Sequence, residues 1–157
     1  MSNVVFKPLA QTPRPLLIEQ LNDARVIAHL PLLHGVFDDA ALDRFLEIKA
    51  ARWEQDGLGH WAFWRDGVFL GWGGFEKEDD VWDFGLVLMP DAFGQGAAIT
   101  RQALAFARTE PCIDTVQFLL APTRRSMRAL QRIGAREAGE IRHGGQIFRR
   151  FLLNVAD

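Results

Sequence analysis

The chain has 157 residues, of which 48% are hydrophobic and 24% are charged, and its formal net charge is −2 at pH 7. This size and composition suit a single domain over residues 1–157, and the near-neutral balance gives no overall basic field for nucleic acid or an anionic membrane. Because there is no secretory signal pattern and no run of about 18 apolar residues, we expect a cytoplasmic protein.

The first third of the chain predicts a strand followed by two helices. Val4–Leu9 is a short β-type run. Thr12 and Pro13 form a good helix start, with a capping hydroxyl and a proline at the first helical position. Apolar residues at helical spacing extend this helix to about His29. A second helix, capped by aspartate and ended by glycine, is predicted over residues 38–57.

Beyond residue 57 the apolar residues follow the period of strands. The stretch HWAFWRDGVFLGWGGF is rich in aromatic residues and is interrupted by Asp66-Gly67, a strong signal for a two-residue hairpin. A second turn is predicted at Glu76–Asp80, and it leads into a third strand, Val81–Met89. We expect these three strands to be antiparallel.

The second half of the chain predicts two helices and three more strands. A helix over Gly96–Arg108 is followed by Ile113–Leu120, an apolar run typical of a strand that is buried on both faces. Because a helix joins this strand to the previous one, the two should be parallel neighbours. A last helix begins at Thr123 or Ser126, and a final hairpin turns at His143–Gly145.

Two glycines, Gly94 and Gly96, lie between the third strand and the helix that follows. They complete neither a dinucleotide-binding fingerprint, because Ile99 stands where the third glycine is needed, nor a P-loop, because no Lys-Ser/Thr follows them. Two interpretations remain: a tight turn without a ligand, or a nest of backbone N–H groups that binds a pyrophosphate at a helix N-terminus. The order of the surrounding elements favours the nest.

The remaining reactive residue types give weak signals. Cys112 is the single cysteine and can form no internal disulfide, so a small buried side chain is predicted. The four histidines, His29, His34, His60 and His143, do not have the spacing of metal ligands, and no metal is expected.

The stretches VWDFGLVLMPDAFGQGAAI and APTRRSMRALQRIGA resemble the GCN5-related N-acetyltransferases (GNAT), and within them the branch of the ribosomal-protein N-terminal acetyltransferases. The resemblance implies an α/β fold whose mixed, mostly antiparallel sheet contains a splayed parallel pair of central strands and is flanked by helices. It also implies acetyl-CoA as cosubstrate and a primary amine as acceptor, either a protein N-terminus or a small molecule. A homodimer is compatible with this class.

The resemblance also assigns cofactor-binding residues by position. The strand residues Val87, Leu88 and Met89 would bind the pantetheine and acetyl groups through their backbone, at a bulge. Thr123 stands in the last helix where relatives usually carry an asparagine. Apart from the resemblance, Arg124 begins a row of arginines with Arg128 and Arg132 along that helix, and we expect it either to touch a CoA phosphate or to belong to a solvated helix face. The pyrophosphate would lie on the glycine-rich turn, whose residues are Phe93, Gly94, Gln95, Gly96, Ala97 and Ala98.

Two residues are candidates for catalysis. Asp83 stands where relatives often carry a glutamate that takes the proton of the amine, and Ser126 matches a serine close to the cofactor sulfur. The simpler alternatives are an exposed acid at a strand end for Asp83 and a helix N-cap for Ser126. The tyrosine that protonates the thiolate in many relatives would fall at Leu130, and the chain contains no tyrosine.

Three other functions remain open at this point. The domain could bind or sense acyl-CoA without catalysis, bind another small molecule or nucleotide, or serve as a structural domain that associates through its aromatic hairpins.

Overall fold

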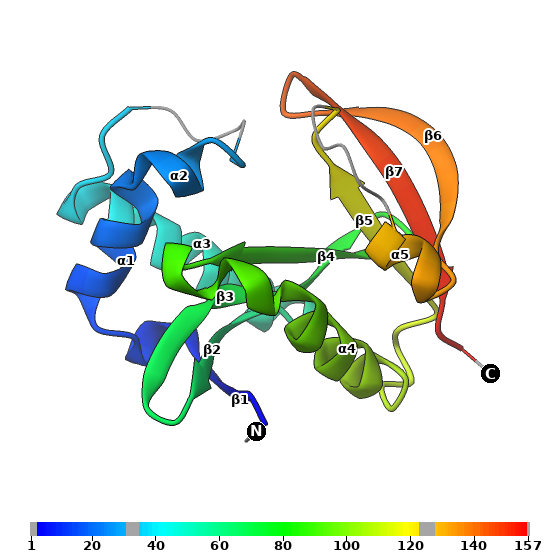
Figure 1. The fold of residues 1–157 in the computed structure, drawn as a ribbon, viewed down its shortest axis with the longest axis horizontal. Coiled ribbons are helices and arrows are strands. Elements are labelled where there is room, and N and C mark those ends of the chain that lie inside the picture. Colours follow the sequence, from blue (N-terminus) through cyan, green and yellow to red (C-terminus); the bar gives the residue numbers. More distant parts are fainter. Residues whose placement is uncertain (1–2, 31–34, 123–127, 157) are drawn as a thin grey trace.

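The computed structural model describes residues 3–30, 35–122 and 128–156. Figure 1 shows the arrangement of their helices and strands. The elements in chain order are β1 (Val5–Pro8), the 3-10 helix η1 (Leu9–Gln11), α1 (Arg14–Asn22), α2 (Ala24–Ile27), α3 (Asp39–Asp56), β2 (His60–Arg65), β3 (Val68–Glu78), β4 (Val81–Leu88), the 3-10 helix η2 (Pro90–Gln95), α4 (Gly96–Ala107), β5 (Thr115–Leu120), α5 (Arg128–Arg132), β6 (Arg136–His143) and β7 (Gln146–Asn154).

The strands form one seven-stranded sheet in the order β1-β2-β3-β4-β5-β7-β6. The pair β4–β5 is parallel, and the other neighbours are antiparallel. The expected mixed sheet with a parallel central pair is therefore confirmed. The helix α4 makes the connection that allows two consecutive strands to run in the same direction.

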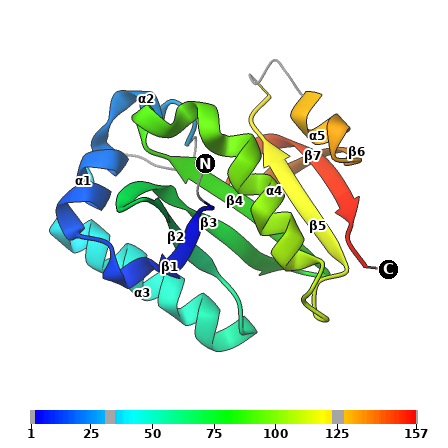
Figure 2. The ribbon, with the colours of Figure 1, turned by 60° about the horizontal axis from the view of Figure 1, so that its bottom comes forward.

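Helices cover both faces of the sheet, and the alternation of side chains along β4 separates the two faces. On one side, Val87 packs in a cluster with residues of α1 and α3, and we call this the α3 face. On the other side, Phe84 and Leu86 pack with residues of α4, and we call this the α4 face. Figure 2 shows α4 lying in front of the sheet.

The first predicted helix does not continue to His29. The backbone of Asp23 is extended, with φ −74° and ψ 125°, so α1 ends before it. The Asp23 carboxylate accepts a hydrogen bond from the Arg25 backbone N–H at 2.8 Å and thereby caps the separate short helix α2. Thr12 does not cap α1, because Pro13 occupies the N-cap position. A local capping carboxylate thus overrides the continuous apolar spacing.

Two other local predictions need correction. The second hairpin turn is tighter than Glu76–Asp80, since β3 continues to Glu78, which pairs with Val81. The turn is therefore Asp79-Asp80, with Asp79 at a φ of 54°. Cys112 is exposed rather than buried, because it precedes the buried part of the apolar run.

The register of β4 against β3 is unbroken from Val81 opposite Glu78 to Leu88 opposite Gly71. The bulge expected in this strand is therefore absent. An irregularity lies instead between β2 and β3, at Phe63. The divergence of β4 from its parallel neighbour consequently needs no distortion of β4 itself.

Gly73 allows β3 and β4 to approach closely, and replacing it should destabilise the fold. A Cβ atom at Gly73 would lie 2.1 Å from the Gly85 carbonyl oxygen and 2.9 Å from the Leu86 Cα, both of them backbone atoms. We expect Gly73→Ala to lower the free energy of unfolding by about 1–3 kcal/mol, as measured by urea denaturation.

Gly94→Ala is the matched control for this substitution. Its added Cβ would meet no atom within 4 Å, and its φ is not in the positive region. The control should therefore stay within about 0.5 kcal/mol of the wild type. Equal losses for both variants would contradict the close approach as the reason for Gly73.

Candidate active site

The strands β4 and β5 are paired over a very short length. Their partners in the described part of the chain are Trp82 with Val116 and Asp83 with Gln117. Beyond Asp83, β4 continues to Leu88 with no partner on β5. The two strands diverge toward their carboxyl ends (Figure 1), which leaves one edge of β4 without a neighbouring strand.

Hydrogen-bond alternation decides which backbone groups face this open edge. The Met89 N–H donates to the Leu70 carbonyl at 2.8 Å, so Met89 bonds toward β3. The Val87 carbonyl oxygen also points toward β3, since it lies 2.2 Å from the position that a Cβ atom would take on Gly71 of that strand. In an antiparallel pair the intervening residues direct their N–H and C=O groups the other way. Leu86 and Leu88 therefore present their backbone to the open edge.

The backbone groups of the three predicted strand residues therefore do not all face the open edge. Leu88 lies with its backbone toward the opening, whereas Val87 and Met89 bond toward β3, and Val87 also accepts a hydrogen bond from the Gln20 side chain at 3.0 Å. Leu86 was missed in the sequence. The period of two along a strand identifies Leu86 only after the bond from Met89 to Leu70 has shown that Leu88 faces the opening.

The glycine-rich turn consists of η2 and the first turn of α4. Gly96 has ordinary helical geometry, with φ −59° and ψ −39°, and Gly94 has no positive φ. A Cβ at Gly96 would meet the Leu88 and Leu86 side chains at 3.5 and 3.7 Å, which are normal contacts, and one at Gly94 would meet nothing within 4 Å. Neither the backbone nor the packing of the described chain requires glycine at these positions.

The turn thus exposes bare backbone at the N-terminus of α4. Gln95 is the N-cap residue, but its side chain makes no capping hydrogen bond. It accepts a hydrogen bond from Arg65 instead, which places a guanidinium beside the turn. A helix N-terminus with a cation nearby favours an anion. Arg65 could not be found from the sequence, because it lies on β2, 30 residues away.

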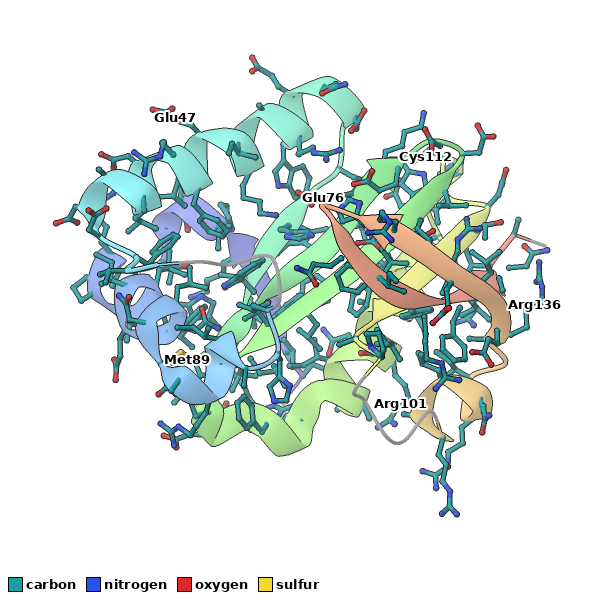
Figure 3. The ribbon with its side chains drawn as sticks, turned by 90° about the horizontal axis from the view of Figure 1, so that it is seen from above. Glu47, Glu76, Met89, Arg101, Cys112 and Arg136 are labelled. Atoms are coloured by element: carbon teal, nitrogen blue, oxygen red, sulfur yellow. The ribbon has the colours of Figure 1, made fainter. Side chains whose placement is uncertain are left out.

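Where β4 and β5 meet, a row of polar side chains crosses the α3 face. The Gln117 amide donates to Asp83 Oδ1 at 3.2 Å, and Arg150 Nε donates to Gln117 Oε1 at 2.7 Å. On the other side of Asp83, Glu76 is its cross-strand partner on β3, and Lys49 Nζ lies 3.1 Å from Glu76 Oε2. We call these five residues the polar row. Figure 3 shows Glu76 among the side chains at the centre of the molecule.

Asp83 is half-buried within β4, so it is not an exposed acid at a strand end. Burial raises its pKa from an ordinary value of 3.8 to about 6; the hydrogen bond from Gln117 lowers this pKa, and the charges of Glu78 and Glu76 raise it. At neutral pH the carboxylate is ionised and can accept a proton. This is the electrostatic behaviour expected of a general base.

His60 reaches this region from β2, and no sequence pattern predicted that it would lie there. Its ring lies against Gly85 of β4, where a Cβ would be 3.3 Å from Cε1. Nε2 lies 3.6 Å from Glu76 Oε1, and neither ring nitrogen has a hydrogen bond within the described ranges. Burial and the charges of Lys49 and Arg52 lower the pKa of His60 well below its usual range, so the ring is neutral.

The last-helix residues of the predicted site, Thr123, Arg124 and Ser126, lie outside the described residues. In the part of the chain that the structure covers, no cluster of three or more His, Cys, Asp or Glu side chains could hold a metal ion. No helix within the same ranges is long and apolar enough to cross a membrane.

Residues 3–136 match the family model described as the acetyltransferase (GNAT) domain. The match covers most of the chain, and the protein therefore belongs to the GNAT acetyltransferase family. As a member of this family it is an acetyltransferase with acetyl-CoA as its cosubstrate. No curated protein sequence matches the chain.

Solved structures support the fold. A GNAT-family acetyltransferase from Bacillus anthracis is 18% identical, with a TM-score of 0.73 and coverage of 98% of this chain and 96% of the other. Spermidine N-acetyltransferase from Vibrio cholerae, in complex with CoA and spermine, is 12% identical, with a TM-score of 0.77 and coverage of 98% and 96%. AAC(6')-Ib, in complex with ribostamycin and coenzyme A, is 13% identical, with a TM-score of 0.80 and coverage of 98% and 94%. The ribosomal-protein branch is not supported by these comparisons.

The burial of Asp83 predicts a specific dependence of stability on pH. Between pH 3.8 and about 6 the folded chain holds a proton that the unfolded chain has lost, so this group makes stability fall as the pH rises through that window. Asp83→Asn removes the effect. The stability of this variant relative to the wild type should increase by about 2–3 kcal/mol from pH 3.5 to pH 7.

Urea denaturation at several pH values measures this difference. Asp80→Asn, at an exposed turn position, is the control for the loss of a carboxylate without burial. A difference between Asp83→Asn and the wild type that stays constant with pH would contradict the raised pKa.

Proposed function

We propose that the protein transfers the acetyl group of acetyl-CoA to a primary amine, with the glycine-rich turn as its pyrophosphate site. One observation carries the proposal: Gly94 and Gly96 are required neither by backbone geometry nor by packing, and they lie at the end of a strand that diverges from its parallel neighbour. An outside ligand that approaches the backbone closely explains both features.

In this proposal the cofactor contacts β4, the glycine-rich turn and the last helix. The backbone groups of Leu86 and Leu88 hydrogen-bond the pantetheine and polarise the acetyl carbonyl. Val87 and Met89 alternate with these residues along the chain and complete the pantetheine site. Arg65 contributes positive charge to the phosphates, and we assign Thr123 and Arg124, which lie outside the described residues, to the cofactor from the sequence alone. The N–H groups that cradle the pyrophosphate are those of the turn Phe93, Gly94, Gln95, Gly96, Ala97 and Ala98.

The reaction requires two protons to leave the acceptor ammonium. One finally resides on the CoA thiol and the other passes to solvent, so the site needs a proton acceptor beside the amine. We assign this role to Asp83, with Ser126 assisting the thiolate. Asp83 precedes Leu86 by three residues, about 10 Å along a strand, so the proton would travel through water.

The proposed acceptor is a primary amine. The Vibrio cholerae relative is named a spermidine N-acetyltransferase, and another is an aminoglycoside acetyltransferase, which supports an amine acceptor here. A protein N-terminus, as the sequence resemblance suggested, stays in the panel of candidates.

Thermal shift with acetyl-CoA, CoA and ATP in parallel is the first test. Selective stabilisation by acetyl-CoA and CoA would support the proposal, whereas stabilisation by ATP, or by none of the three, would oppose it. Transfer to a panel of amines then separates an enzyme from a domain that only senses acyl-CoA.

Gly94→Ala should weaken acetyl-CoA binding without weakening the fold. The added methyl group meets no protein atom within 4 Å but occupies the space proposed for the pyrophosphate. We expect Kd, measured by calorimetry, to rise about tenfold or more, a loss of at least about 1.4 kcal/mol. The melting temperature of the free protein should not decrease.

Gly96→Val tests the same site with a larger side chain, and Ala105→Ser, on the exposed side of α4, is the control. If Gly94→Ala lost stability and binding equally, the turn would be structural.

Asp83→Asn should reduce kcat by about 100-fold at saturating acetyl-CoA, because an amide cannot accept the proton of the amine. The wild-type rate should rise with pH through about 6, the pKa of the buried carboxylate, and this step should disappear in the variant. The same acceptor must be used throughout, since its own amine also titrates.

Nearly full kcat with an unchanged pH profile would mean that solvent takes the proton. In that case the enzyme would work by positioning its two substrates alone.

A further inference from the structure

We propose that the acceptor amine carries an anionic oxygen group, such as a carboxylate, and that Arg150 binds this group. The inference rests on the proposed function, because it names the substrate class of the same site. It follows from the charges that face Asp83 on the α3 face.

The acidic side chains near Asp83 already have basic partners. Lys49 Nζ lies 3.1 Å from Glu76, and both side chains are largely buried, with exposed fractions of 15% and 13%. Arg52 lies 3.4 Å from Glu78. A polycationic acceptor would have to compete with these cations, and removing one partner of a buried pair is costly.

Arg150 differs from these paired residues. It is half-buried, and the one hydrogen bond of its side chain in the described part of the chain uses Nε. A guanidinium has five N–H donors in a planar fork that matches a carboxylate or phosphate. The terminal nitrogens of Arg150 have no partner among the described residues, whereas the neighbouring Arg149 is paired with Glu137 at 2.7 Å.

The distance between Arg150 and the proposed base suits a small molecule. Gln117 connects them through two hydrogen bonds of 3.2 and 2.7 Å, so Asp83 Oδ1 and Arg150 Nε lie within about 8 Å of each other. An amine held near Asp83 and an anion held by Arg150 can therefore belong to one molecule of the size of an amino acid.

Glu76 and Glu78 are the acids whose charges act on Asp83, and both have the basic partners named above. The segments 31–34 and 123–127 read PLLH and TRRSM, which contain no Asp or Glu. A small cavity of about 70 Å³ is lined by Glu19, Asp23 and Asp91. It adjoins Met89, six residues and about 20 Å along the strand from Asp83, so it lies at the opposite end of β4.

The experiment compares matched acceptors at saturating acetyl-CoA. The pairs are 4-aminobutyrate with butylamine, β-alanine with propylamine, and phosphoethanolamine with ethanolamine, and spermidine is added as a polycation. We expect kcat/KM to be at least about tenfold higher for the anionic member of a pair, corresponding to about 1.4 kcal/mol. A preference within the phosphoethanolamine pair alone would identify the anion as a phosphate.

Arg150→Gln should bring the ratio within each preferred pair close to one, and Arg150→Lys should give an intermediate ratio because it retains the charge without the fork. Arg149→Gln, on the neighbouring residue, should leave the ratio unchanged. Equal losses for both members of a pair in Arg150→Gln would mean that Arg150 only supports Gln117, and would overturn the inference.

The possible failures can be distinguished. Acetylation of spermidine or of the amines without an anionic group, in preference to the anionic members of the pairs, would overturn the inference and leave the proposed function intact. Binding of acetyl-CoA without acetylation of any amine would overturn the proposed function, and the inference with it.

Discussion

The two-residue pairing between β4 and β5 is the constraint on which the rest of the site depends. Each strand is secured on its other side, β4 by eight register pairs with β3 and β5 by six with β7. The strands can therefore separate beyond Asp83 without loosening the sheet. Their separation leaves backbone groups of β4 unpaired at the open edge, and unpaired groups of this kind need a ligand or water.

The strand β4 separates two chemically different surfaces. On the α4 face, small residues expose the backbone at a helix N-terminus, which suits a phosphate. On the α3 face, polar side chains from five elements meet at the vertex where the two strands are still paired. A reaction between a phosphate-bearing donor and an amine needs both surfaces. Alternating residues of β4 face the two sides of the sheet, so this one strand contributes to the donor surface on the α4 face and to the amine surface on the α3 face.

The fold was largely predictable because its signals are local. The hairpin dipeptide Asp66-Gly67, the change from helical to strand period and the proline after α4 act over a few residues. The break at Asp23 was missed because a capping carboxylate competes with continuous apolar spacing, and sequence patterns do not show which prevails.

The site was predictable only in part, for a related reason. Asp83 and the glycine-rich turn follow from position in a motif. His60, Arg65 and Arg150 do not, since each reaches the site through a contact between elements that are distant in the sequence. The choice between Leu86 and Val87 depends on the hydrogen-bond register, which a period of two cannot decide without one observed bond.

Gln117 explains how a cation and a base can occupy the same row. If a basic side chain contacted Asp83 directly, its charge would favour the carboxylate and lower the pKa, which would weaken Asp83 as a proton acceptor near neutral pH. The neutral amide instead donates to Asp83 with its nitrogen and accepts from Arg150 with its oxygen. It thus fixes the positions of both groups and keeps the guanidinium away from the carboxylate. Burial can then hold the pKa of Asp83 at about 6 while Arg150 remains charged beside it.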